Sequence, residues 1–222
     1  MSVSLQRMRP GRRSNEALDQ PLTPEQRSAM IAAATRKFEE LLEILQVDHR
    51  FDHNTRDSPA RVARMFVEET MAGRFNPPPT ITAFDNAGQF ENLIVTGPID
   101  VRSTCAHHFM PIYGHAYIGV VPRRHGRIIG LSKYDRIVEH FAARLQIQEE
   151  LVQQIGAHVM ETTAPLGLAV RISAVHMCKT HRGVHATHRS RMVTTSYFGS
   201  LATDQFLKDE FLRESASIER GL

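Results

Sequence analysis

The chain has 222 residues and a mass of 25.1 kDa, and 41% of its residues are hydrophobic and 23% charged. This composition is typical of a soluble globular protein of one or two domains, and it excludes collagen-like and fully disordered chains. No apolar run approaches the ~20 residues of a membrane helix, and no secretory signal is recognisable, so we expect a cytoplasmic protein without membrane contact. A net charge of +3 predicts no nucleic-acid partner.

The first third of the chain is predicted to be helical. Residues 1–22, which include Arg7, Arg9, Arg12 and Arg13, are expected to form a flexible, solvated tail. Thr23 followed by Pro24 and Gln26 is a capping-box pattern that predicts a helix start. A second helix is expected from an N-cap at Ser58 to Gly73, which makes 23–75 a helical segment that ends before the prolines at 77–79.

Residues 76–222 are predicted to form the second part of the protein, built on a sheet. Period-two hydrophobicity indicates strands over 90–105, with a break at Gly97 and Pro98, and over 114–122, 168–178 and 191–198. Helices are expected from an N-cap at Ser132, over 148–163, and over 203–214. The fold class is therefore α+β, with an antiparallel sheet, flanking helices and an N-terminal helical segment. The edges of such a sheet favour an oligomer.

Two short windows concentrate the residues that could bind a metal. Seven of the twelve histidines lie in 105–115 and 176–188, and each window holds one of the two cysteines, Cys105 and Cys178. Cys105 and His108 form a C-x2-H pair, and His176 would share a strand face with Cys178. Two thiolates and one imidazole predict a zinc ion with an open fourth position, which is the catalytic pattern. Inert buried thiols and a disulfide are the alternatives, and a cytosolic setting disfavours the disulfide.

Other residues could bind an anionic nucleotide. Ser132, Lys133 and Arg136 lie at a helix start, where backbone N–H groups and two cations could hold phosphate. Gln148 and Glu149 side by side could recognise the donor edge of guanine. The alternatives are an ordinary helix start with solvated charges and carboxylates that complement the helix dipole. Further basic residues follow Cys178, at 179–182, and lie one turn apart at 61 and 64.

Four segments together resemble the GTP cyclohydrolase I family. They are SPARVARMFVEETMAG, STCAHHFMPIYGHAYIGVVP, IIGLSKYDRIVEHFAARLQIQEELVQQI and VHMCKTHRGVHATHRSRMVTTSYFG, and the likeness runs from about residue 24 to 200 in the order and spacing of that family. The resemblance implies the tunnelling fold, assembled into a toroidal homodecamer (a dimer of pentamers) with active sites at subunit interfaces. It also implies GTP as the substrate and Zn²⁺ as the cofactor.

The resemblance also implies a role for individual residues. Zinc would be bound by Cys105, His108 and Cys178, and His107 and His176 would transfer protons, with Ser132 also at the catalytic site. Guanine recognition falls on Gln148 and Glu149, and triphosphate contacts fall on Ser132, Lys133, Arg136, Arg182, Arg61 and Arg64. The implied reaction is hydrolytic opening of GTP, release of formate and rearrangement to 7,8-dihydroneopterin triphosphate, the first step of tetrahydrofolate and pterin (or 7-deazapurine) biosynthesis.

The sequence departs from the family pattern at two places. Ala106 replaces the usual glutamate between the cysteine and the histidine pair, and His181, His185 and His188 are unusual additions. A missing carboxylate near the metal could weaken zinc affinity or change the pH profile. Two rival functions are a non-catalytic nucleotide- or pterin-binding paralogue and another tunnelling-fold enzyme, such as a nitrile reductase. The first has no need of two proton-transfer histidines, and the second needs a metal-free nucleophilic cysteine.

Overall fold

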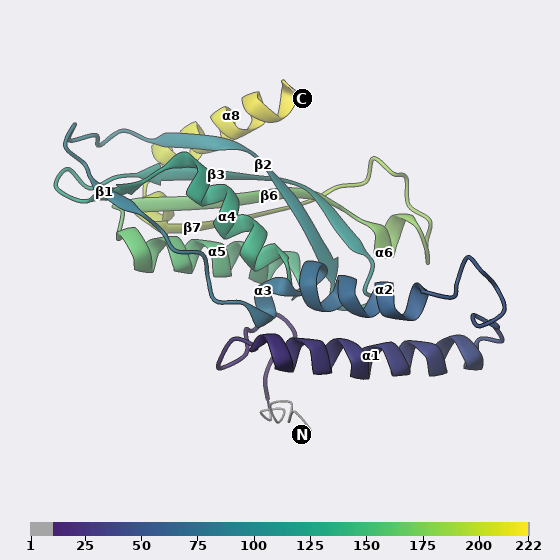
Figure 1. Ribbon diagram of the computed structural model, residues 1–222. Helices are drawn as coiled ribbons and strands as arrows, with labels where there is room; N and C mark the ends of the chain where they lie inside the picture. The colour runs from purple at the N-terminus through teal and green to yellow at the C-terminus, as the bar shows by residue number, and fades with distance from the viewer. Residues whose placement is uncertain (1–10, 222) are drawn as a thin grey trace. The chain divides into compact units, whose positions relative to one another are not determined.

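The computed structural model describes residues 11–221, which divide into two compact units at the boundary between Pro77 and Pro78. Residues 1–10 of the expected tail lie outside the described residues. Figure 1 shows the helical first unit in purple and blue and the sheet of the second unit in teal to green.

The first unit is a helical hairpin with a small core of its own. Helix α1 (Pro24–Ile44) begins with the predicted capping box of Thr23 and Gln26. It is followed by α2 (Ser58–Met65), a π-helical turn η1 (Phe66–Thr70) and α3 (Ala72–Phe75). The N-cap of α2 is Asp57 rather than the predicted Ser58, and Ser58 and Pro59 form its first turn. The rings of Phe38 and Phe66 stack at 5.8 Å and join α1 to η1.

Part of the segment expected as a tail packs against this hairpin. The backbone N–H groups of Leu18 and Leu22 donate to the carbonyls of Arg74 and Phe75, at 2.9 and 3.1 Å. The Arg74 guanidinium donates in turn to three carbonyls over residues 13–16. Leu22 is buried with Val67 and Phe75. Backbone hydrogen bonds and a small apolar cluster therefore hold residues 13–22 on α3. The prediction of a tail relied on the basic residues of this segment, and these contacts leave no signal in its charge.

The second unit is built on a five-stranded sheet in the order β5-β2-β3-β6-β7, within the described residues. Its strands are β2 (Ile94–Cys105), β3 (Pro111–Val121), β5 (Leu145–Gln146), β6 (Gly167–His176) and β7 (Met192–Gly199). The pairings are antiparallel except β2 with β5. The expected break in β2 is present as a register shift between Thr96 and Ile99. A separate ribbon pairs β1 (Ala83–Asp85) with β4 (Arg127–Ile129).

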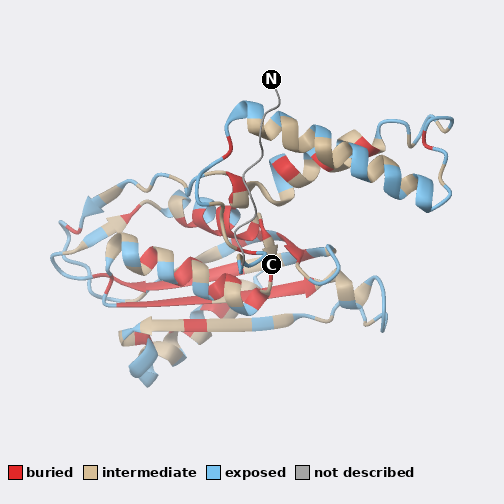
Figure 2. Ribbon diagram, turned by 90° about the horizontal axis from the view of Figure 1, so that it is seen from below, coloured by how far each residue is buried: buried red, intermediate tan, exposed pale blue. Residues whose placement is uncertain are grey.

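Helices cover the two faces of this sheet, and in Figure 2 its inner strands are accordingly buried along most of their length. Helices α4 (Leu131–Ala142) and α5 (Gln148–Thr163) cover one face, where Ile118, Val170 and Ile172 join the main core. The other face carries α8 (Gln205–Arg220), preceded by the short α7 (Ser200–Thr203), and buries Tyr117 and Phe211. The observed α+β sheet with flanking helices therefore agrees with the predicted fold class.

Candidate active site and metal centre

The two cysteines and one histidine meet at one end of the sheet. Ligand atoms of Cys105, His176 and Cys178 all lie within 4.8 Å of one another. Tetrahedral zinc, with Zn–S bonds of about 2.3 Å and Zn–N bonds of about 2.0 Å, has donors that lie within this limit of one another. The residues present therefore fit a zinc ion by donor type, and they lie close enough together to share one ion.

Strand β2 delivers Cys105 to this cluster, and the chain then turns tightly. Cys105 is buried at 3% exposure, and its backbone N–H donates to the Met110 carbonyl at 2.8 Å. Phe109 closes the turn with a φ of +56°, so residues 106–109 project from the end of the sheet. The short strand β5 pairs with Cys105 from the other side. Pairing on both sides fixes the position of the Cys105 thiol.

Cys178 reaches the cluster in a different way from the one predicted. Strand β6 ends at His176, and Cys178 lies in the helical turn α6 (Met177–Thr180) instead of on the strand. The turn brings Cys178 back towards His176, so the two side chains meet without the shared strand face. Alternating hydrophobicity gave no sign of this turn because Val175 and Met177 continue the strand pattern.

Burial governs the electrostatics of the cluster. Burial and then the neighbouring Cys105 raise the pKa of the Cys178 thiol. Burial lowers the pKa of His176, and the nearby Glu149 carboxylate partly opposes this. Cys178 and His176 therefore favour their neutral forms, which leaves a lone pair on the imidazole. A bound cation would reverse the effect on the thiols, because it stabilises the thiolate.

Comparison with known proteins assigns the chain to a family. The family model of GTP cyclohydrolase I matches residues 34–216. GTP cyclohydrolase 1 of Edwardsiella ictaluri (strain 93-146) is 37% identical over 195 residues, which cover 87% of this chain and 86% of that protein. GTP cyclohydrolase 1 of Flavobacterium johnsoniae is 39% identical over 176 residues, covering 78% and 76%. This chain belongs to the GTP cyclohydrolase I family. The predicted family and enzyme class are confirmed.

A likeness to one solved structure is weaker. The apo form of the archaeosine synthase QueF-Like has a TM-score of 0.37 and 14% identity, over 49% of this chain and 92% of that chain. This value is too low to bear on the fold.

The histidine pair of the GTP cyclohydrolase I motif lies beside the cluster, and its two members differ in their contacts. His107 Nδ1 lies 3.7 Å from the Cys105 sulfur. His108 is exposed, and its Nε2 accepts a hydrogen bond from the Arg182 guanidinium at 2.9 Å. The histidine that the structure groups with both cysteines is therefore His176, whereas the family resemblance places His108 among the ligands.

Gln148 and Glu149, at the start of α5, have opposite surroundings. Glu149 is exposed, whereas Gln148 is only 1% exposed. The Gln148 amide nitrogen donates to the carbonyls of Ile172 and Met192 and to Thr194 Oγ1. Its amide oxygen lies 2.8 Å from His176 Nε2. The Gln148 amide therefore makes its hydrogen bonds within the protein. Of these two residues, Glu149 is the one whose side chain is exposed and can accept hydrogen bonds from a base.

The predicted phosphate-binding residues of α4 lie away from the cluster in the same chain. The N-cap of α4 is Gly130 and not the predicted Ser132, because the helix already begins at Leu131. The segment that follows the C-terminal end of α4 contains β5, and β5 pairs with Cys105. Twelve helical residues span about 18 Å, so Ser132 and Lys133 lie near the opposite end from Cys105. Among the described residues, no side-chain hydrogen bond or ion pair joins Ser132, Lys133 or Arg136 to the cluster.

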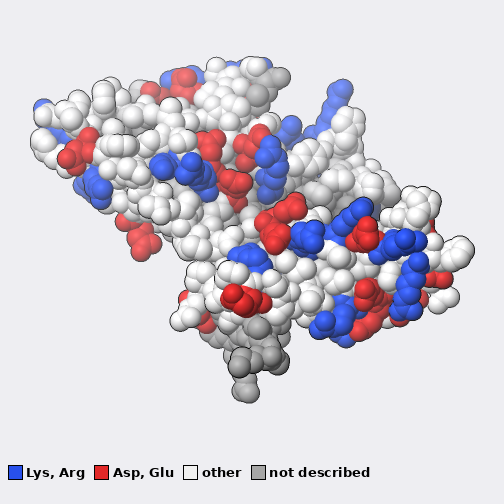
Figure 3. Space-filling model, viewed as in Figure 1, with Lys and Arg blue, Asp and Glu red and all other residues white. Residues whose placement is uncertain are grey.

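Two further predicted substrate contacts belong to the helical first unit. Arg61 pairs with Asp57 at 3.2 Å, and Arg64 lies 3.9 Å from Glu68. All four side chains are largely exposed, so these pairs are weak and exchangeable. Figure 3 shows side chains of both charges interspersed over this part of the surface. Both arginines remain accessible to an anion.

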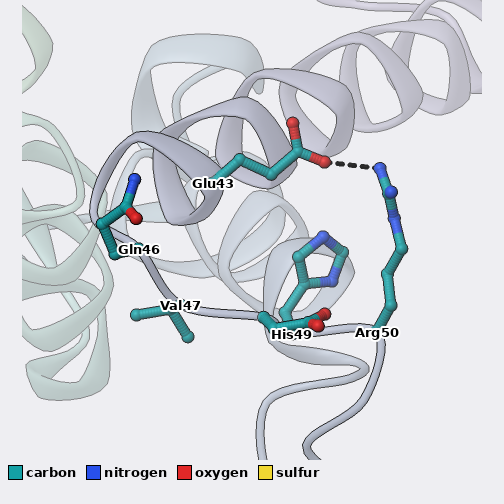
Figure 4. Close-up of a pocket in the computed structure, with 6 residues that line it drawn as sticks. Glu43, Gln46, Val47, His49 and Arg50 are labelled. Carbon is teal, nitrogen blue, oxygen red and sulfur yellow. Dashed lines mark hydrogen bonds and ion pairs between the residues drawn. The ribbon is translucent and has the colours of Figure 1, made fainter.

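The first unit also contains a cavity that the sequence did not indicate. It has a volume of about 510 Å³ and lies at the end of α1, where Glu43, Gln46, Asp48, His49 and Arg50 line it (Figure 4). Arg50 forms an ion pair with Glu43 across its rim. The His49 ring is 5% exposed, and neither of its nitrogens has a hydrogen-bond partner within residues 11–221. None of the predicted site residues lines this cavity.

Within residues 11–221, no helix combines the length and the apolar character needed to cross a bilayer.

Proposed function

We propose that the protein hydrolyses GTP and rearranges it to 7,8-dihydroneopterin triphosphate with release of formate. The observation that carries this proposal is the Cys105–His176–Cys178 cluster, with His107 beside it, in a chain of the GTP cyclohydrolase I family. Its place would be the first step of tetrahydrofolate and pterin, or 7-deazapurine, biosynthesis, in the cytoplasm.

Zinc is the proposed cofactor. Cys105 and Cys178 would hold it together with His108, as the family resemblance implies, and His176 would then transfer protons. Bound there, zinc would lower the pKa of a water molecule and so supply a nucleophile near neutral pH. The grouping of His176 with both cysteines favours a second assignment, in which His176 is the ligand. The zinc contents of His108→Ala and His176→Ala separate the two assignments, because only the ligand variant should lose the metal.

The chain's own residues account for the remaining steps. A proton delivered to N7 of guanine would make C8 electrophilic, and the half-buried His176 is suited to this transfer. His107, at the exposed side of the cluster, would donate a proton to the leaving ring nitrogen and later to the ribose oxygen. Glu149 would accept hydrogen bonds from the donor edge of guanine. The cations and hydroxyl proposed for the triphosphate are Ser132, Lys133, Arg136, Arg182, Arg61 and Arg64.

We propose that the site is completed between protomers of a tunnelling-fold ring, a homodecamer. The separation between the start of α4 and the Cys105 cluster supports this, because one chain alone does not bring Ser132 and Lys133 to the metal ligands. The sheet order also leaves the outer side of β7, and most of the outer side of β2, without a partner strand among the described residues. Such edges can pair between protomers and close a barrel.

One incubation tests the reaction. Purified, zinc-loaded protein is incubated with GTP, with and without a chelator, and formate and oxidised neopterin are measured. We expect both products, and we expect both to disappear with the chelator. Formate without neopterin would show a reaction that stops at ring opening, and neither product despite bound GTP would favour the non-catalytic paralogue. The meeting of both cysteines in one cluster disfavours an enzyme that needs a metal-free nucleophilic cysteine.

A further inference from the structure

The Gln148 amide has only one possible orientation in this fold. Its nitrogen end lies 3.1 Å from the carbonyl oxygens of both Ile172 and Met192, and 3.0 Å from Thr194 Oγ1. Backbone carbonyls accept hydrogen bonds and never donate, so the NH₂ group must point towards them. The amide oxygen must then point the opposite way, towards His176. Reversing the amide would set its oxygen against two carbonyl oxygens in a buried position, at a large cost in free energy.

This orientation determines which nitrogen of His176 carries the proton. The amide oxygen of Gln148 can only accept, and it lies 2.8 Å from His176 Nε2. The ring must therefore donate from Nε2, and a neutral imidazole carries a single N–H. The lone pair is then left on Nδ1, the ring nitrogen that does not bond to Gln148, in a residue that groups with Cys105 and Cys178.

We propose that Gln148 is a positioning residue: it holds His176 in the Nε2–H tautomer and so leaves the lone pair of the ring on Nδ1, available to a metal ion or a proton. This role replaces guanine recognition for Gln148 and leaves that task to Glu149. The hydrogen bond also fixes the ring's rotation, because Gln148 is itself tied to β6 through Ile172 and to β7 through Met192. Partners of this kind commonly orient metal-binding and proton-transferring histidines.

The tautomer can be measured directly on the wild-type protein. The metal-free protein is labelled with ¹⁵N and ¹³C in histidine, and solid-state NMR at neutral pH distinguishes the two tautomers by their ring shifts. His176 is identified among the twelve histidines by the signal that is missing in His176→Gln. We expect the Nε2–H form alone. A dominant Nδ1–H form, or a mixture, in the wild-type protein would overturn the proposal.

One variant of Gln148 and a matched control separate positioning from a general structural role. Gln148→Met removes the acceptor and should produce a mixture of tautomers. A matched control is Gln153→Met on the same helix, which loses a hydrogen bond of 2.8 Å to Ser196 Oγ but does not touch His176. The control should leave the His176 signal unchanged. Retention of the pure Nε2–H form in Gln148→Met would contradict the proposal.

The kinetic part of the test rests on the proposed function. Gln148→Met should lower kcat by about 10–100-fold, the usual cost of removing such a partner, and leave KM for GTP within about twofold. A raised KM with an unchanged kcat and a wild-type tautomer would assign Gln148 to guanine binding instead. If the wild-type protein does not convert GTP at all, the proposed function fails, but the NMR measurement still decides the role of Gln148.

Discussion

At the scale of single residues, the proposed roles predict that metal binding and proton transfer at the cluster can be separated by substitution. Cys178 contributes a sulfur to the donor set, whereas His107 is outside this set and its Nδ1 lies 3.7 Å from the Cys105 sulfur. Cys178→Ala should therefore abolish both zinc binding and GTP turnover. His107→Ala should keep about one zinc per protomer and lose activity by about 10²–10⁴-fold, as expected for a missing proton-transfer group.

Zinc content by atomic emission and formate release measure the two effects separately. A zinc-free His107→Ala protein would show that His107 is a ligand, and full zinc content in Cys178→Ala would remove Cys178 from the metal site. Circular dichroism serves as the control for folding in both variants.

His140 is a residue whose protonation should destabilise the fold. Burial, then Arg144 and His158, lower its pKa from 6.5 to about 4, and its Nε2 lies 2.8 Å from the Arg144 guanidinium. Since the pKa is lowered in the folded state, the unfolded chain binds the proton more readily between these values. The stability that His140 contributes is therefore complete above pH 6.5 and is lost as the pH falls towards 4.

The matched variant is His140→Gln, which keeps an acceptor for Arg144 but does not titrate. Between pH 7 and pH 4, the free energy of unfolding of the wild type should fall by about 2 kcal/mol more than that of the variant. Urea unfolding at several pH values measures this difference. Parallel pH profiles for the two proteins would contradict the role given to His140.

At the scale of elements, α8 is held on the sheet by one large side chain. Phe211 is fully buried with Tyr117 and Leu201, and its ring occupies the space directly over Gly119. Phe211→Ala should lower the free energy of unfolding by about 3–5 kcal/mol, because it leaves a cavity in a closed cluster. The control, Phe206→Ala on the same helix, should change it by less than about 0.5 kcal/mol, since Phe206 is 72% exposed. Similar losses in the two variants, in urea unfolding, would show that α8 is not anchored in this way.

The elements also show how far the sequence predicts this protein. The capping box at Thr23, the long helix at Gln148 and the four long strands follow from local signals that the fold retains. The three short strands were not predicted, because two or three residues carry no periodicity and β5 exists only through its pairing with Cys105. The predicted caps at Ser58 and Ser132 lie inside their helices for a related reason: a cap depends on backbone geometry that the residue type alone does not fix.

For the site, spacing and residue type identified both cysteines and His176, but not the amide that orients His176. Gln148 belongs to a buried network whose partners, Ile172 and Met192, lie 24 and 44 residues away. No local pattern relates these positions. Its proximity to Glu149 in sequence instead suggested a shared function that their opposite burial does not support.

At the scale of the whole molecule, the distance between the start of α4 and the cluster predicts that activity needs more than one chain. Lys133→Ala and His107→Ala should each be inactive alone. Co-expressed in mixed oligomers, they should recover about a quarter of the wild-type activity, since each site would take one half from each of two protomers. Formate release from the mixed oligomers, isolated through two different affinity tags, measures this recovery. No recovery in stable mixed oligomers would show that each site lies within one chain.

The meeting of Cys105 and Cys178 has a consequence for how the protein withstands heat. The two residues lie 73 positions apart in the sequence, so an ion held by both sulfurs bridges strand β2 and the turn α6 at a point that only the folded chain provides. Binding to the folded state alone adds about 2.7 kcal/mol of stability when free zinc is a hundredfold above its Kd. The melting temperature should therefore rise with zinc concentration even in His107→Ala. Thermal stability would then report how much zinc the protein has bound, whether or not the protein is catalytically active.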